Sequence, residues 1–161
     1  MEIALKTKSI TISLIQFLGV LLIIILSQMI FKNQFITGTI INTLLICSLY
    51  LLGLRQAIGI AIIPSLFSVL TGLMAPAIIP FVPFIILGNI ILILSLNYFK
   101  NYFIGGVLGA FLKFLFLFLS SSFIFTFLPE PICYAMSYPQ LITATLGVAL
   151  AFIILKTLKR V

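Results

Sequence analysis

The sequence contains no histidine, tryptophan or aspartate, and its only acidic residues are Glu2 and Glu130. Catalysis that needs a histidine base or a pair of aspartates is therefore excluded, and so is a histidine-ligated metal site. Charged residues make up 7% of the chain, whereas a typical soluble domain has about 25%. Together with 63% hydrophobic residues, these shortages predict an integral membrane protein that is not an enzyme and has no metal or cofactor.

Six apolar runs follow one another along the chain, and each approaches the roughly 20 residues that a helix needs to cross a bilayer core. The runs cover residues 10–31, 35–54, 57–74, 81–99, 102–127 and 138–155. Because they use most of the chain, no room remains for a soluble domain. The sequence therefore predicts one all-α integral membrane domain over residues 1–161, a bundle of six transmembrane helices surrounded by the lipid bilayer.

Positive residues are distributed unevenly over the segments that flank the predicted helices. On one side of the bundle, only Lys32 lies in a connection. On the other side, the tails and the second and fourth connections hold Lys6, Lys8, Arg55, Lys100, Lys156, Lys159 and Arg160. By the positive-inside rule, both termini are expected in the cytoplasm. Because the positive charges are dispersed, no nucleic-acid partner is expected.

The third connection is apolar and rich in proline. Residues 75–83 contain Pro76, Pro80 and Pro83, and proline cannot continue an α-helix. An irregular apolar segment at membrane depth must lie against protein or cover a cavity. We therefore expect an irregular outer segment here that packs onto the bundle or closes a cavity.

Polar side chains inside the predicted helices gather toward the outer half of the bundle. One interpretation is helix packing, in which small residues and amides join neighbouring helices. Packing does not require such an asymmetry, however, and a ligand pocket that opens outward does. We therefore predict a pocket formed by the third to sixth helices and closed by residues 32–34 and 76–83. Its expected ligand contacts are Asn89, Lys113, Gln140, Ser120, Thr143, Ser68 and Asn42.

Lys113 lies near the middle of the fifth run, where an unpaired lysine costs at least about 2.5–3.5 kcal/mol. No acidic residue lies within any run, so the expected partners are carbonyl groups, water, an anionic ligand or Glu130. Side chains lean toward the N-terminus of their helix, which would direct Lys113 toward the cytoplasm. Two roles stay open: contact with a ligand, and a structural role that holds helices together.

The predicted helices lack the acidic and histidine residues that proton-driven transporters use as relays. The chain also has no Gly-x-x-x-x-Gly-Lys-[Ser/Thr] nucleotide loop. If the protein moves a solute, its energy is expected to come from a partner. Three methionines at outer helix ends, Met29, Met74 and Met136, are interpreted as adaptable packing rather than as ligands of a soft metal.

Three stretches of the chain are similar to those of a known family. They are residues 64–89, PSLFSVLTGLMAPAIIPFVPFIILGN; residues 105–123, GGVLGAFLKFLFLFLSSSF; and residues 135–147, AMSYPQLITATLG. With six short helices, a proline-rich outer loop and no energy source, the chain resembles the substrate-binding S component of an energy-coupling-factor (ECF) transporter. It is similar to a bacterial subgroup whose substrate is poorly defined.

The resemblance implies a function in the plasma membrane of a bacterium. An S component captures a vitamin or similar micronutrient from outside and docks on a membrane T component that carries two ATPase subunits. Family members dock through an Ala-x-x-x-Ala pattern near the cytoplasmic end of the first helix. The nearest counterpart in this chain is Ser9-x-x-x-Ser13, which keeps two small residues at that spacing.

Other function classes stay open beside this interpretation. A stand-alone channel or facilitator needs a continuous polar stripe through both halves of the bundle, whereas this chain is polar mainly in the outer half. A membrane assembly or regulatory subunit is a further alternative. An intramembrane enzyme would need a nucleophile and a base, and the sequence offers no such pair.

Overall fold

The computed structural model describes residues 2–99 and 101–161, and it describes side chains from residue 11 onward. All regular structure in these residues is helical. In chain order the helices are α1 (Glu2–Ile30), α2 (Gln34–Leu52), α3 (Leu54–Leu70), the 3₁₀ helix η1 (Pro76–Phe81), α4 (Val82–Tyr98), α5 (Tyr102–Leu119), the π-helix η2 (Ser120–Ile124), α6 (Glu130–Ala135) and α7 (Tyr138–Thr157).

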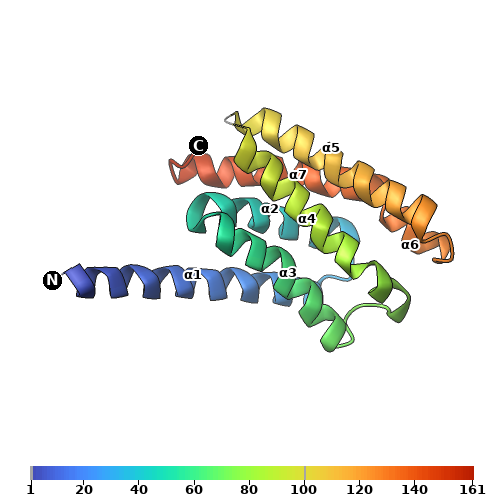
Figure 1. The fold of residues 1–161 in the computed structure, drawn as a ribbon, viewed down its shortest axis with the longest axis horizontal. Coiled ribbons are helices and arrows are strands. Elements are labelled where there is room, and N and C mark those ends of the chain that lie inside the picture. The colour runs from blue at the N-terminus through green and yellow to red at the C-terminus, as the bar shows by residue number, and fades with distance from the viewer. Residues whose placement is uncertain (1, 100) are drawn as a thin grey trace.

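The predicted all-α fold with six apolar helices is confirmed. Five segments are long and apolar enough to cross a membrane, and α3 is a shorter apolar helix of 17 residues. The long helices run side by side, and both ends of the chain lie at the same end of the bundle (Figure 1). We call the half of the bundle near the chain ends the terminal half and the opposite half the distal half.

The second connection differs from the sequence prediction. It consists of Gly53 alone, whose φ of 95° is a backbone conformation that favours glycine. The Gly53 amide donates to the carbonyls of Ser48 and Leu49, which closes α2. Arg55 therefore lies in the first turn of α3 rather than in the connection, and Lys100 lies outside the described residues.

The proline-rich segment also differs from the expectation of an irregular loop. Residues Pro76–Phe81 form a 3₁₀ helix, and Pro83 lies in the first turn of α4. Pro76 and Pro83 are tolerated because the first turn of a helix needs no backbone N–H donor, whereas Pro80 lies inside the 3₁₀ helix. The segment thus turns the chain into α4 at the distal end without a long irregular stretch.

Glycine at the contact lets several helix pairs approach each other closely, and two of these contacts involve polar residues. A Cβ atom at Gly147 of α7 would lie 2.5 Å from Asn42 Cβ of α2, which is closer than packed atoms allow. At Gly109 of α5, a Cβ atom would lie 3.0 Å from Ser95 Cβ of α4. These contacts support the interpretation of the glycines as packing residues, and they bring polar side chains of α2, α4, α5 and α7 within reach of one another.

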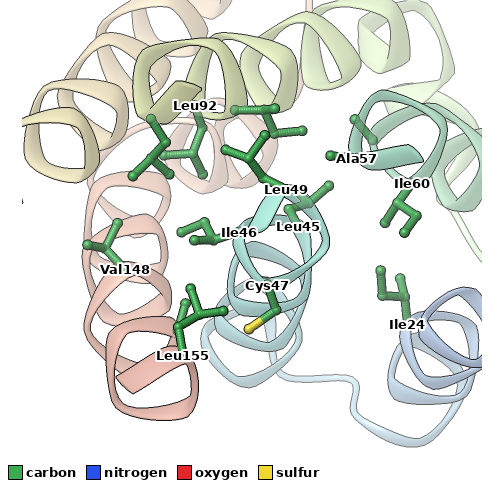
Figure 2. Packing of buried hydrophobic residues seen from close by; sticks show 14 of the residues in the cluster. Ile24, Leu45, Ile46, Cys47, Leu49, Ala57, Ile60, Leu92, Val148 and Leu155 are labelled. Carbon is green, nitrogen blue, oxygen red and sulfur yellow. The ribbon is translucent and has the colours of Figure 1, made fainter. Parts of the chain in front are cut away.

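The terminal half has an apolar core. Leu45 and Ile46 of α2 are fully buried against Leu92 of α4 and Leu155 of α7. Figure 2 shows these side chains pointing toward one another, with Ile24 of α1 at the edge of the cluster. A smaller apolar cluster around Phe81, Leu117 and Phe125 lies in the distal half.

Helix α1 differs from the others in how little of it is covered. Only 17% of its apolar part, within Thr11–Ile30, is buried in the bundle. Its main neighbours are α2 and α3. Large apolar side chains such as Ile15, Leu18 and Leu22 are exposed. An apolar helix with this much exposed surface is suited to contact with lipid.

Candidate functional site

Lys113 of α5 is at the centre of a polar network inside the bundle. Its ammonium donates to Asn42 Oδ1 at 2.6 Å and to Asn89 Oδ1 at 2.7 Å, and only 3% of the residue is exposed. The two amides come from α2 and α4, so the network joins three helices. Carbonyl groups were among the expected partners of Lys113, and the observed acceptors are the side-chain amide carbonyls of Asn42 and Asn89.

A second contact extends the network to α7. Asn42 Nδ2 approaches Thr143 Oγ1 at 3.5 Å, and the Thr143 hydroxyl donates to the Gln140 carbonyl at 3.3 Å. An ammonium group only donates, so both amide oxygens must face Lys113 and both amide nitrogens must face away from it. Asn42 thus connects Lys113 to α7 through its nitrogen, next to the close approach at Gly147.

A cavity of about 510 Å³ lies against this network in the distal half. Its inner wall includes Asn42, Asn89 and Lys113. The exposed residues of its lining all lie at or near the distal helix ends, so the cavity opens there: Met29, Phe31, Lys32, Leu73 and Ala75. The volume falls within the range of about 300–1,000 Å³ that is typical of small-molecule sites.

Asn89 is the most informative side chain of the inner wall. It is 5% exposed, and its Oδ1 accepts from Lys113, whereas its Nδ2 has no hydrogen-bond partner in the described residues. Among those residues, every fully enclosed side-chain nitrogen or oxygen has a partner. The Asn89 nitrogen is therefore not enclosed, and it faces the cavity that Asn89 lines. A donor at this position is available to a molecule that occupies the cavity.

Glutamines hold the mouth of the cavity together. Gln28 of α1 accepts a hydrogen bond from Ser68 of α3. Gln34 of α2 donates to the Ala135 carbonyl at 2.6 Å, and Gln140 of α7 donates to the same carbonyl at 3.3 Å. These bonds tie α1 to α3, and they tie α2 and α7 to the last residue of α6, so the mouth is formed by elements distant in sequence.

The charge of the cavity is one-sided. Lys113 lies in its inner wall and the exposed Lys32 at its mouth, and no acidic residue occurs among its described lining residues. Glu130, which was considered as a partner for Lys113, is exposed in the first turn of α6 and does not line the cavity. The cavity therefore carries positive charge and a surplus of hydrogen-bond donors at its inner end.

Five of the seven predicted ligand contacts line one cavity, and two do not. The lining set comprises Asn42, Asn89, Lys113, Ser68 and Gln140. Thr143 lies behind Asn42, and Ser120 donates to the Phe116 carbonyl at 2.7 Å, away from the cavity. The predicted closing segments are also partly found, because Lys32, Gln34 and Ile78 belong to the lining. Whether these residues contact a ligand stays a prediction.

The sequence prediction missed part of the contribution of the first two helices to the wall. Asn42 was expected as a ligand contact and residues 32–34 as a closing segment, but Gln28 and Ile41 line the cavity as well. Gln28 lies near the end of its predicted helix, where a polar residue is ordinarily hydrated, so no signal set it apart. All three methionines of the outer helix ends line the cavity as well.

Of the predicted docking pair, Ser13 is partly exposed and Ser9 lies outside the residues whose side chains are described.

The fold defines this chain as a multi-span helical membrane protein, and the candidate site is a mostly apolar cavity that has a polar network in its inner wall and opens at the end away from the termini. In comparisons with known proteins, no family model, curated protein or solved structure matches the chain. The resemblance to ECF S components therefore rests on the three stretches quoted above.

Proposed function

We propose that this protein is the membrane-embedded substrate-capture subunit of an ECF-type importer for a vitamin or similar micronutrient. The observation that carries the proposal is the distal cavity, with Lys113 and the unpartnered Asn89 amide in its inner wall. Pockets that bind small molecules are mostly apolar and contain a few convergent polar groups. This cavity has that composition, since Ile41, Ile60 and Ile85 line it beside the network.

The apolar core of the terminal half favours capture over conduction. Below the Lys113 network, the space between α2, α4 and α7 is filled by leucine and isoleucine. Two buried hydroxyls there donate to backbone carbonyls of neighbouring helices and so do not line a path: Ser95 donates to Gly105 at 3.0 Å and Tyr102 to Val148 at 2.8 Å. A channel needs a polar path through both halves, so the alternative of a stand-alone channel or facilitator is less favoured.

The proposed orientation places the termini in the cytoplasm and the cavity mouth outside the cell. Arg55, Lys156, Lys159 and Arg160 lie at the terminal end, whereas Lys32 lies at the distal end. This distribution supports the orientation through the positive-inside rule. A cavity that faces outward is accessible to a nutrient before import.

The proposed partners are a T component and two ATPase subunits in the plasma membrane of a bacterium. Their support is the family resemblance together with the missing nucleotide loop and relay acids in this chain. We expect Ser9 and Ser13 of α1 to lie at the contact with the T component, because small residues let two helices approach closely. The bilayer and a small molecule are the other expected partners.

Two measurements test the proposal. Native mass spectrometry of the protein purified from bacterial membranes should detect a retained small molecule, and co-expression with the T component and ATPases should yield a complex. Replacing Ser9 and Ser13 together by Leu should prevent the complex and keep the small molecule. A wild-type protein that retains no small molecule, and that co-purifies with no T component, would contradict the proposed function.

A further inference from the structure

We propose that the cavity binds a monocarboxylate, with its carboxylate group against Lys113 and Asn89 and an apolar body along the isoleucine wall. We define the isoleucine wall by its residues: Ile41, Ile60, Ile78 and Ile85. The inference rests on the proposed capture function and names the chemical class of the molecule that is captured.

The charge of the inner wall is not balanced by the protein. Asn42 and Asn89 give the Lys113 ammonium two hydrogen-bond acceptors, but both are neutral amides. No acidic side chain is present among the described residues that line the cavity. Because a buried positive charge is most stable beside a negative one, the missing counter-charge points to an anionic ligand.

The available donors also match a carboxylate. An ammonium has three N–H donors, and the amides use two of them. The Asn89 nitrogen adds a donor that faces the cavity and has no partner in the described part of the protein. An ionised carboxylate has only acceptors, and hydrogen bonds that involve charged groups are the stronger ones. Two oxygen atoms of one carboxylate can therefore take the donors that the network leaves.

The rest of the cavity limits the ligand to one anionic group and an apolar body. Among the described residues of the lining, Lys113 is the only buried cation, since Lys32 is exposed at the mouth. A phosphate monoester would bring a charge of about −1.5 to −2 and three acceptor oxygens, more than these donors match. The isoleucine wall and Met29, Met74 and Met136 offer apolar contacts to the remainder of the ligand.

A purely structural role for Lys113 makes a different prediction. If the ammonium only joins α2, α4 and α5, a carboxylate and the primary amide of the same shape should bind equally well. A matched acid and amide pair therefore separates the two roles. The acid and its amide have nearly the same size and differ in charge, so the comparison does not depend on how well the body fits.

The experiment measures protection of a cysteine placed in the cavity. In a protein with Cys47→Ala and Cys133→Ala, Ile78→Cys introduces a thiol in the lining, and a maleimide reports its accessibility. The probes are benzoate with benzamide, nicotinate with nicotinamide, and octanoate with octanamide. The first two pairs represent water-soluble aromatic acids, and the third represents an acid derived from lipid.

In at least one pair, we expect the acid to protect the thiol at a concentration about 10-fold lower than its amide, which corresponds to about 1.4 kcal/mol. Asn89→Asp should abolish this preference, because the new carboxylate neutralises Lys113 and repels the ligand. The variant keeps an acceptor for Lys113, so the fold should survive. Ser120→Ala, which changes a hydroxyl outside the cavity, should leave the preference intact.

Several results would overturn the inference: amides that protect as well as their acids, a preference that persists in Asn89→Asp, or no protection by any acid at millimolar concentration. A failure of this inference can be distinguished from a failure of the proposed capture function. If native mass spectrometry finds a bound neutral molecule without a carboxyl group, the carboxylate inference is wrong and the capture function stands.

Discussion

The distal and terminal halves of the bundle are built from the same helices but have opposite interiors. In the terminal half, Leu45, Leu49 and Leu155 fill the space between α2 and its neighbours. One to two turns away along α2, Asn42 joins a polar network beside a cavity. The change occurs within a few residues of each helix, so single side chains rather than different folds decide which half is packed and which is hollow.

The boundary between the halves lies at the Lys113 network, next to a close approach of α2 and α7. Gly147 lets α7 contact α2 at Asn42, so the Lys113 network is supported by tight packing between these two helices. On the other side, Asn89 is open to the cavity. Tight packing thus belongs to the terminal half and the boundary, whereas the candidate binding cavity belongs to the distal half.

The orientation of the two halves has the largest expected effect, because labelling is all or none. In the cysteine-free background, Asn33→Cys at the distal end should react with an impermeant maleimide added outside intact cells. Lys159→Cys at the terminal end should react only after the cells are permeabilised. The opposite pattern would place the cavity mouth in the cytoplasm and remove the basis for capture from outside.

The boundary should be the most sensitive point for stability. Gly147→Leu should lower the free energy of unfolding by about 3 kcal/mol, because even a Cβ atom there would lie 2.5 Å from Asn42 Cβ. Gly19→Leu on α1 is the matched control, since nothing lies within 4 Å of its added Cβ atom. Unfolding of the purified proteins in increasing sodium dodecyl sulfate measures both, and equal effects would contradict the close packing of α2 on α7.

The inner wall of the distal half should be the most sensitive point for binding. We expect Asn89→Leu to weaken ligand binding by about 10- to 100-fold, or about 1.4–2.8 kcal/mol, because it removes a donor that faces the cavity. Leu suits the membrane interior, so the fold should be retained. Calorimetric titration with the ligand found by mass spectrometry tests this, with Ser120→Ala as the control. A large loss of thermal stability with unchanged affinity would assign Asn89 to helix packing alone.

The smallest effect on stability and binding is expected at Thr143, which contacts Asn42 but does not line the cavity. Thr143→Val removes a long hydrogen bond of 3.5 Å from Asn42 Nδ2 and keeps the shape of the side chain. Hydrogen bonds between membrane helices contribute about 0.6 kcal/mol on average. Stability should therefore fall by about that amount, and affinity should not change by more than about twofold. A loss of affinity equal to that of Asn89→Leu would mean that Thr143 contacts the ligand.

Much of the fold could be predicted from the sequence because the membrane imposes strong rules. Long apolar runs must be helical, and each of the six runs overlaps one long helix, with most ends within four residues of the observed ones. The exceptions are the start of α1 at Glu2, against residue 10 in the prediction, and the end of α5 at Leu119, against residue 127. Prediction was weaker where single residues decide the backbone. Gly53 ends α2 earlier than expected, and the 3₁₀ helix that begins at Pro76 could not be distinguished from an irregular loop.

The candidate site was partly predictable for a different reason. A polar residue inside an apolar helix is costly, so Asn42, Asn89 and Lys113 stood out individually. Their mutual contacts did not, because residues on three helices share no spacing rule in sequence. Gln28 was missed since it lies near the end of α1, where polarity is ordinary and burial depends on how α1 packs.

The central claim is that the distal half holds a small molecule against Lys113 and Asn89, and a crystal structure of the protein purified from bacterial membranes tests it most directly. We predict compact electron density in the cavity that ends within hydrogen-bond distance of Lys113 Nζ and Asn89 Nδ2. The density should be absent from the Asn89→Leu variant. A cavity filled by an acyl chain that bypasses these two groups, or one closed by Asn89 donating to another helix, would contradict the account.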